Sequence, residues 1–198
     1  MVSSSNHIGW PSALEGAHLI ERLARLVRMG EQGAGLNPAQ WEALRYLARA
    51  NRFSRTPAAL ADYVASTRGT ISRTLASLEA KGYVRREANA RDGRSVEFVL
   101  TKNALQALKR DPLLVLAKDI EQANGGSLAA VLEGLRKTLR AALARNQSRA
   151  FGVCASCRHF RRNLRPGSAM PHQCALLDEP LSEADSRRIC VEQEPHAA

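Results

Sequence analysis

The chain has 198 residues, 44% of them hydrophobic and 24% charged, so it can bury one good core and a small additional module. The formal net charge is +10 and the sequence pI is about 10.2, which favours a polyanionic partner. No apolar run approaches the roughly 20 residues of a membrane span, and the N-terminus lacks the layout of a signal peptide. We therefore expect a cytoplasmic protein with no membrane partner. Cysteines in that compartment serve as metal ligands or sensors more often than they form structural disulfides.

The positive charge is concentrated in the middle of the sequence. Between Arg45 and Arg94, eleven Lys and Arg residues stand against four Asp and Glu residues. After Ala150, six arginines are balanced by six acids. This distribution favours a nucleic-acid partner for the central segment over a generic role in solubility.

The first predicted helix covers residues 12–29 and is opened by a capping box of Ser12 and Glu15. Asn37, followed by proline, is a typical start for a second helix over residues 39–50. The expected core face of that helix is Trp41, Leu44, Leu47 and Ala48, from their helical spacing.

Thr56, again followed by proline, starts a short helix over residues 58–64, and a tight turn then leads into residues 67–81. In this next helix Ile71, Leu75 and Leu78 share one face. The opposite face has no acid and consists of small polar residues with one arginine, namely Gly69, Thr70, Ser72, Arg73 and Ser77.

A β-hairpin is predicted next, with strands at residues 83–87 and 96–100 around an Asp92-Gly93 turn. A helix with an acid-free outer face, followed by an arginine-tipped hairpin, is typical of a winged helix-turn-helix. Helices resume after Thr101, are interrupted at Asp111-Pro112, and continue over residues 113–123. A long helix over residues 128–145, capped by Ser127, carries a sustained leucine stripe. That stripe packs either on its own domain or, as we expect, on a second subunit.

Residues 36–101 resemble the DNA-binding domain of MarR-type transcription regulators. The resemblance rests on LNPAQWEALRYLA, ALADYVASTRGTISRTLASLEAKGYVRRE and RDGRSVEFVLT, and with the flanking helices it covers about residues 12–147. It implies a homodimer on a pseudo-palindromic operator in double-stranded DNA, usually a repressor that responds to a small ligand or to oxidation. We expect a mainly α fold with a small β-hairpin wing and dimerisation helices at residues 12–35 and 102–147.

For the helix that starts at Thr67, entry into the major groove would bring its N-terminal half to base edges and phosphates. Arg73 could read a guanine, Thr70 and Ser72 could contact bases or phosphates, and Arg68 lies nearer the backbone. Gly69 permits close approach, while Thr67 is expected to be the N-cap. In the wing, the resemblance implies a minor-groove role for Arg94, which Arg91 could share. The predicted DNA-binding residues are Arg68, Gly69, Thr70, Ser72, Arg73, Arg91 and Arg94.

Residues 148–198 extend beyond that resemblance and contain all four cysteines of the chain, Cys154, Cys157, Cys174 and Cys190. A Cys-x-x-Cys pair with two further cysteines can supply four thiolates to one metal site. The lone third and fourth cysteines favour an iron–sulfur cluster slightly over zinc; disulfides or a bare thiol switch are the alternatives. We expect a small four-cysteine module that depends on its metal to fold.

Two functional hypotheses follow for a DNA-binding regulator. In the first, the cysteine module senses redox or metal status, and strain passes into the preceding helix at residues 128–145. In the second, zinc is a structural staple and an aromatic small molecule binds between the winged domain and the dimerisation helices. A redox carrier or enzyme with a basic docking surface is a remote third reading, because the sequence has no nucleophile–base constellation or phosphate-binding loop. We therefore expect no enzymatic activity.

Overall fold

The computed structural model describes residues 11–31, 35–88 and 96–196. Three helices lead into the hairpin: α2 (Pro38–Arg49), α3 (Pro57–Tyr63) and α4 (Arg68–Ala80), with a short 3-10 turn, η2 (Arg52–Ser54), between α2 and α3. Strands β1 (Val84–Ala88) and β2 (Val96–Leu100) then pair antiparallel, with Val84 opposite Leu100. The expected fold class, mainly helical with a small hairpin wing, is confirmed.

The winged-helix domain has one hydrophobic core to which each of its helices and strands contributes. Leu44, Leu60, Leu75 and Leu78 are at most 1% exposed, and Phe98 of β2 closes the core from the hairpin side. Three of the four residues on the expected core face of α2 are buried, namely Trp41, Leu44 and Leu47. Ala48 is exposed, whereas Ala43 and Tyr46 are buried. Tyr46 is accommodated because its hydroxyl donates to the carbonyl oxygen of Ser54 at 2.6 Å.

Helix starts were predicted correctly where proline follows a capping residue. The Asn37 side chain accepts from the Gln40 N–H in a capping box, and Thr56 accepts from the Ala59 N–H. Two other predicted caps were wrong. Helix α1 (Ser12–Gly30) follows Pro11, which puts Ser12 inside the first turn, and α7 (Ala129–Arg145) follows Leu128, one residue past Ser127.

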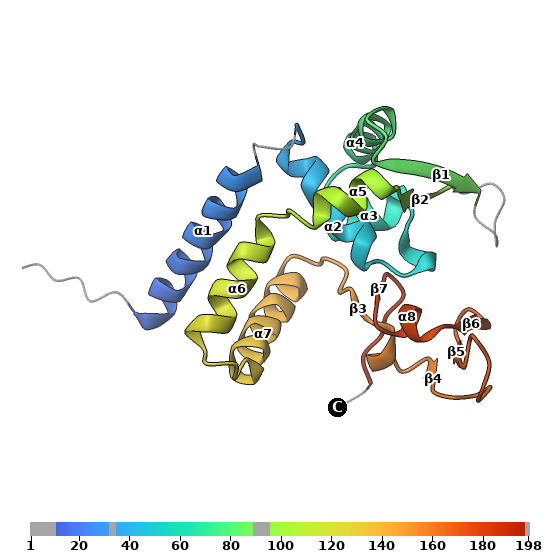
Figure 1. The fold of residues 1–198 in the computed structure, drawn as a ribbon. Coiled ribbons are helices and arrows are strands. Elements are labelled where there is room, and N and C mark those ends of the chain that lie inside the picture. Colours follow the sequence, from blue (N-terminus) through green and yellow to red (C-terminus); the bar gives the residue numbers. More distant parts are fainter. Residues whose placement is uncertain (1–10, 32–34, 89–95, 197–198) are drawn as a thin grey trace, which may run out of the picture.

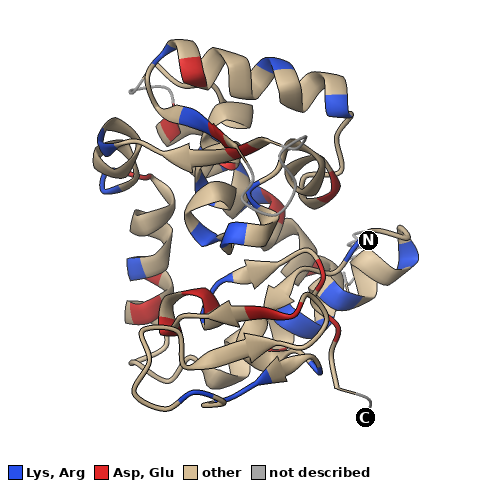
Figure 2. Ribbon diagram, turned by 90° about the vertical axis from the view of Figure 1, so that its right-hand side faces the viewer, with Lys and Arg blue, Asp and Glu red and all other residues tan. Residues whose placement is uncertain are grey.

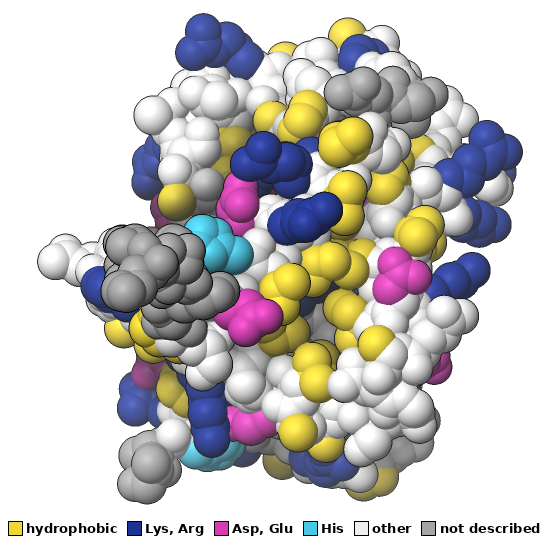
Figure 3. All heavy atoms as spheres, turned by 90° about the vertical axis from the view of Figure 1, so that its left-hand side faces the viewer, with side chains coloured by type: hydrophobic (Ala, Val, Ile, Leu, Met, Phe, Trp, Pro, Cys, Tyr) yellow, Lys and Arg dark blue, Asp and Glu magenta, His cyan; other side chains and the backbone are white. Residues whose placement is uncertain are grey.

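Helices α1, α6 (Leu113–Ala123) and α7 lie together on one side of the winged-helix domain, to which α5 (Lys102–Leu108) connects them (Figure 1). Within the described chain, α1, α6 and α7 have no fully buried residue. Their large hydrophobic side chains are exposed instead, including Leu19, Leu26 and Leu139 at 55–59%. Figure 3 shows hydrophobic side chains gathered on this face.

The C-terminal module, residues 148–196, is built from short strands. Strand β3 (Gly152–Val153) pairs with β7 (Ile189–Cys190), and β4 (Phe160–Arg161), β5 (His172–Cys174) and β6 (Glu179–Leu181) form a three-stranded sheet. A 3-10 turn, η3 (Cys154–Ser156), follows β3. A short helix, α8 (Glu183–Ser186), follows β6 and is capped by Ser182, which forms a capping box with Asp185.

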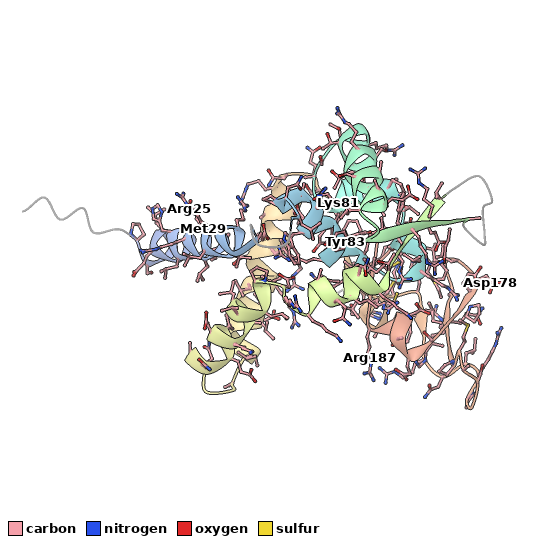
Figure 4. All side chains as sticks on the ribbon, turned by 45° about the horizontal axis from the view of Figure 1, so that its top comes forward. Arg25, Met29, Lys81, Tyr83, Asp178 and Arg187 are labelled. Carbon is pink, nitrogen blue, oxygen red and sulfur yellow. The ribbon has the colours of Figure 1, made fainter. Side chains whose placement is uncertain are left out.

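The C-terminal module packs directly on the winged-helix domain. Ile189 belongs to the domain's hydrophobic core, and the ring of Phe151 lies edge-on against Tyr46 and Tyr63, with centroids 6.0 and 5.1 Å away. Figure 4 shows Arg25 and Met29 of α1 far from Asp178 and Arg187 of the module, with Lys81 and Tyr83 between them. None of the described helices is long and apolar enough to cross a membrane.

Candidate nucleic-acid interface and cysteine cluster

Helix α4 presents the predicted outer face to solvent. Thr67 is the N-cap, as expected: its hydroxyl oxygen accepts from the Thr70 N–H at 3.1 Å and lies 2.8 Å from the Thr70 hydroxyl. Arg73 reaches back along the helix, and its Nε donates to the Gly69 carbonyl oxygen at 3.4 Å. The predicted contact residues of this helix are all exposed, namely Arg68, Gly69, Thr70, Ser72 and Arg73.

Gly69 has no packing role inside the protein. A Cβ at this position would meet no heavy atom within 4 Å, and its φ is not in the left-handed region. Glycine inside a helix costs about 1 kcal/mol relative to alanine, so its presence needs a reason other than the fold. Close approach of a partner to the outer face is such a reason.

The opposite side of α4 is fixed to the domain. Ile71, Leu75 and Leu78 are buried. Ser77 was predicted on the outer face, but it is half-buried and its hydroxyl accepts from the Gln40 side chain at 2.9 Å. The turn from α3 to α4 contains Ala65 at φ +51°, and the Ser66 N–H bonds the Ala61 carbonyl. The outer face is therefore presented by a rigidly packed helix.

The wing is connected to the domain at its base. The Phe98 N–H donates to the Arg55 carbonyl at 2.8 Å, and Arg86 bonds Glu79 of α4 at 2.8 Å while lying over the Phe98 ring. Arg85 pairs with Glu87. The Arg86 side chain is therefore held by contacts within the domain. Arg91, Arg94 and the predicted Asp92-Gly93 turn lie outside the described residues. Figure 2 shows Lys and Arg residues on the upper helices and also on loops of the C-terminal module.

The four cysteines come from three parts of the module, with Cys154 and Cys157 at η3, Cys174 in β5 and Cys190 in β7, and all four are free. Cys154, Cys157 and Cys190 are buried and Cys174 is half-buried. The thiols are close enough for Cys154 to bond Cys190 and for Cys174 to interact electrostatically with both Cys157 and Cys190. Within the described ranges, however, no group of three or more His, Cys, Asp or Glu residues is arranged to hold a metal ion.

Each cysteine sulfur accepts a hydrogen bond from an amide N–H. The Asn51 side chain donates to Cys154 Sγ at 3.1 Å, and the Glu194 N–H donates to Cys157 Sγ at 3.5 Å. Backbone N–H groups of Leu176 and Leu177 serve Cys174, and that of Glu192 serves Cys190. Such donors favour the thiolate over the thiol.

The hydrogen bond between Cys154 and Cys190 shifts the pKa values of the two thiols in opposite directions. The hydrogen bond from Cys154 lowers the pKa of the Cys190 thiol, and bonds from Asn51 and Ser54 lower it further. The same bond, together with burial, raises the pKa of Cys154. Burial raises the pKa of Cys174. The pair is thus poised with one thiolate, which is the form that binds metals and reacts with oxidants.

Two features of this site were not predicted from the sequence. The first is the contribution of the winged-helix domain, through Asn51 and Ser54, for which the sequence carries no signal because these residues lie more than 100 positions before the cysteines they contact. The second is His172, which is 3% exposed. Its Nδ1 accepts from the Asn163 N–H at 3.1 Å, so its Nε2 donates to Glu183 at 3.0 Å. Both ring nitrogens are therefore engaged in the module's own structure.

A helix-turn-helix with an exposed acid-free helix and a hairpin wing has the architecture of the winged-helix class, in which such a helix can enter the major groove of DNA. Residues 34–95 match the MarR family. No curated protein matches the sequence.

Solved structures share the fold. A variant of MepR from S. aureus is 17% identical, with a TM-score of 0.51 over 70% of this chain and 100% of that chain. BldR from Sulfolobus solfataricus is 25% identical, with a TM-score of 0.48 over 66% and 96%. Wild-type MarR from E. coli in its apo form is 22% identical, with a TM-score of 0.49 over 68% and 98%. Each match spans nearly the whole of the other protein and leaves about a third of this chain without a counterpart.

Proposed function

We propose that the chain is a homodimeric, sequence-specific DNA-binding transcription regulator, acting as a repressor in the cytoplasm. The observation that carries this proposal is the exposed, acid-free face of α4, with Gly69 at its centre and arginines beside it. In this fold such a helix enters the major groove, and two copies in a dimer read half-sites about 34–36 Å apart. A pseudo-palindromic operator in double-stranded DNA is therefore the expected ligand.

Dimerisation is supported by the helices outside the winged domain. Helices α1, α6 and α7 have hydrophobic side chains at helical spacing, yet these side chains are exposed in the single chain. A contiguous apolar face of this kind on a protein surface is typical of a subunit interface. A second copy of the same chain would bury the face and hold two α4 helices at a fixed separation.

Arg73→Ala is expected to reduce discrimination between the operator and random DNA by about 1–3 kcal/mol, which is the contribution of one bidentate contact to guanine. Affinity for random DNA should fall only by about the amount expected from the loss of one positive charge. The measurement is fluorescence anisotropy with both DNAs at several salt concentrations. An equal loss on both sequences would refute a base-reading role for Arg73.

A second variant, Gly69→Ala, tests whether DNA approaches this face of α4 closely. Because a Cβ at position 69 meets open space, alanine should stabilise α4 by up to about 1 kcal/mol. If DNA approaches this face closely, the same variant should bind the operator more weakly. A variant that is more stable and binds equally well would show that Gly69 faces only solvent.

We further propose that the four cysteines hold an iron–sulfur cluster or a metal ion that senses redox or metal status. Three observations support the fit. Cys154 and Cys190 are in hydrogen-bond contact, each of the four sulfurs accepts at least one amide hydrogen bond, and the pKa of Cys190 is lowered. Amide hydrogen bonds to the sulfurs are among the features that set the potential of such clusters.

Protein purified anaerobically is expected to contain a stoichiometric metal that is lost in Cys157→Ser. An iron–sulfur cluster gives a brown protein with broad visible absorption, whereas zinc gives a colourless one. Metal analysis together with the absorption spectrum separates the two. Metal-free protein, with all four thiols titrating with a thiol reagent, would exclude both forms of the site.

A second candidate keeps zinc as a staple and assigns the signal to an aromatic small molecule. It is favoured by a cavity of about 600 Å³ between α1, α2, α6 and α7. Its walls are mainly apolar, including Leu23, Leu116 and Leu135, with Glu42 and Arg45 among the polar residues. Burial raises the pKa of Glu42. A colourless zinc protein whose DNA affinity is unchanged by zinc removal would favour this candidate.

A further inference from the structure

Asn51, which follows α2 in the DNA-binding domain, is 0% exposed and faces the cysteine cluster. Its Nδ2 donates to Cys154 Sγ at 3.1 Å and also bonds the Cys190 sulfur. Its Oδ1 is buried and has no hydrogen-bond partner among the described residues. A single amide therefore directs its donors at two cysteine sulfurs and leaves its acceptor unused.

This orientation suits anionic sulfurs. A neutral thiol can donate its own proton to an amide oxygen, whereas a thiolate can only accept. An amide donor held against cysteine sulfurs is also the arrangement by which outer-shell residues orient and tune the thiolate ligands of a metal.

The main chain around Asn51 is held by the strand that carries Cys190. The Asn51 N–H donates to the Ile189 carbonyl at 2.9 Å, and the Val191 N–H donates to the Ser54 hydroxyl oxygen at 2.9 Å. Ala50 forms a parallel bridge with Ile189. The connection from α2 to α3 is therefore hydrogen-bonded to both neighbours of Cys190, Ile189 and Val191.

The cysteine module is remote from the DNA-facing side. In Figure 1, α4 lies at the top of the winged-helix domain and the C-terminal module lies at the bottom. DNA held on the outer face of α4 is thus on the other side of the domain from the cysteines. A signal from the cysteines must therefore pass through the domain. The connection between α2 and α3, which is hydrogen-bonded to the strand of Cys190, leads directly into α3, the first helix of the helix-turn-helix.

We infer that Asn51 and Ser54 of the DNA-binding domain complete the four-cysteine site, and that a metal ion bound there changes DNA affinity through the connection between α2 and α3. This inference rests on the proposed metal site and DNA binding. It differs from the expected route, in which strain passes into the helix at residues 128–145. By reciprocity, DNA changes metal affinity by the same factor by which metal changes DNA affinity.

The test uses the full-length protein and Co²⁺ as a probe, since its thiolate absorption reports the sulfur ligands. Asn51→Leu keeps a similar side-chain volume and removes the amide. We expect it to bind Co²⁺ about 10–100-fold more weakly, as measured by competition with a chelator. The ratio of DNA affinities with and without Co²⁺ should differ from 1 in the wild type and approach 1 in the variant.

The matched control is Asn124→Leu, which removes an amide that bonds the Ile120 carbonyl at 2.8 Å at the end of α6. It should leave both measurements unchanged. Thermal unfolding verifies that each variant is folded, and Ser54→Ala serves as the second variant if Asn51→Leu unfolds. Ser54→Ala is expected to move the ratio of DNA affinities with and without Co²⁺ toward 1, as Asn51→Leu does.

The outcomes separate this inference from the proposals beneath it. Wild-type protein that binds no Co²⁺ through thiolates, or that binds it as Cys157→Ser does, would overturn the metal site itself. Failure of the wild type to bind operator DNA in either state would overturn the DNA-binding proposal. Thiolate-bound Co²⁺ with equal affinity in the wild type and Asn51→Leu, or a wild-type DNA-affinity ratio of 1, would overturn the inference alone.

Discussion

Arg45→Met is expected to destabilise the protein by about 3–5 kcal/mol, because it leaves two buried carboxylates without their cation. Arg45 of α2 donates through Nε and Nη2 to the two oxygens of Asp111, at 2.8 and 2.6 Å. Its Nη1 donates to Glu31 at 2.6 Å. The Glu31 and Asp111 side chains are only 3% and 7% exposed. Methionine would retain most of the packing and none of the charge.

The measurement is urea unfolding, with Arg49→Met as the matched control in the same helix. Arg49 is exposed and makes one 3.3 Å bond to the Tyr63 hydroxyl, so its replacement should cost no more than about 1 kcal/mol. Equal costs for the two variants would show that the Arg45 network contributes little. The network also joins the end of α1, α2 and the residue before Pro112, so its loss should loosen the attachment of α1 and α6 to the DNA-binding domain.

A double variant, Leu19→Glu with Leu26→Glu, is expected to convert the dimer to a monomer and to lower operator affinity by about 10²–10⁴-fold. The loss arises because a monomer engages one half-site without the effective concentration that a linked second site provides. Leu19 and Leu26 are more than half exposed in the single chain, so the subunit itself should remain folded. Light scattering after gel filtration gives the mass, and anisotropy gives the affinity.

The matched control is Leu164→Glu with Leu176→Glu. These leucines of the C-terminal module are 56% and 45% exposed, so the same chemical change is made away from α1, α6 and α7. The control should remain dimeric. If the α1 double variant also stays dimeric, the exposed apolar face is not the subunit interface.

The winged-helix domain could be predicted because its signals are local. Ile71, Leu75 and Leu78 fall on one helical face, and Thr67, Asn37 and Thr56 cap helices within three residues of themselves. The capping prediction failed at Ser12 and Ser127, because α1 follows Pro11 and α7 follows Leu128, and neither residue makes a side-chain capping hydrogen bond. Ala48 was misplaced because the buried face of α2 turns toward Ala43 and Tyr46, and the Tyr46 hydroxyl donates to the Ser54 carbonyl.

The cysteine site was predicted only in part. Spacing alone indicates four thiols in one segment, but it does not indicate what they pack against. The contact between Asn51 and Cys154 joins residues 103 positions apart, with no periodicity or motif to connect them. The roles of Arg68, Gly69, Thr70, Ser72 and Arg73 remain predictions, although their exposure on α4 is compatible with them.

The position of Ile189 in the core of the winged-helix domain has a consequence for synthesis. Residues 36–101 leave the ribosome first, and N-terminal domains generally fold during translation. Here the core is completed by Ile189, a side chain of the C-terminal module. The DNA-binding domain therefore reaches its final packing only after residue 189 has been synthesised, and a chain truncated before that residue lacks part of the domain's interior.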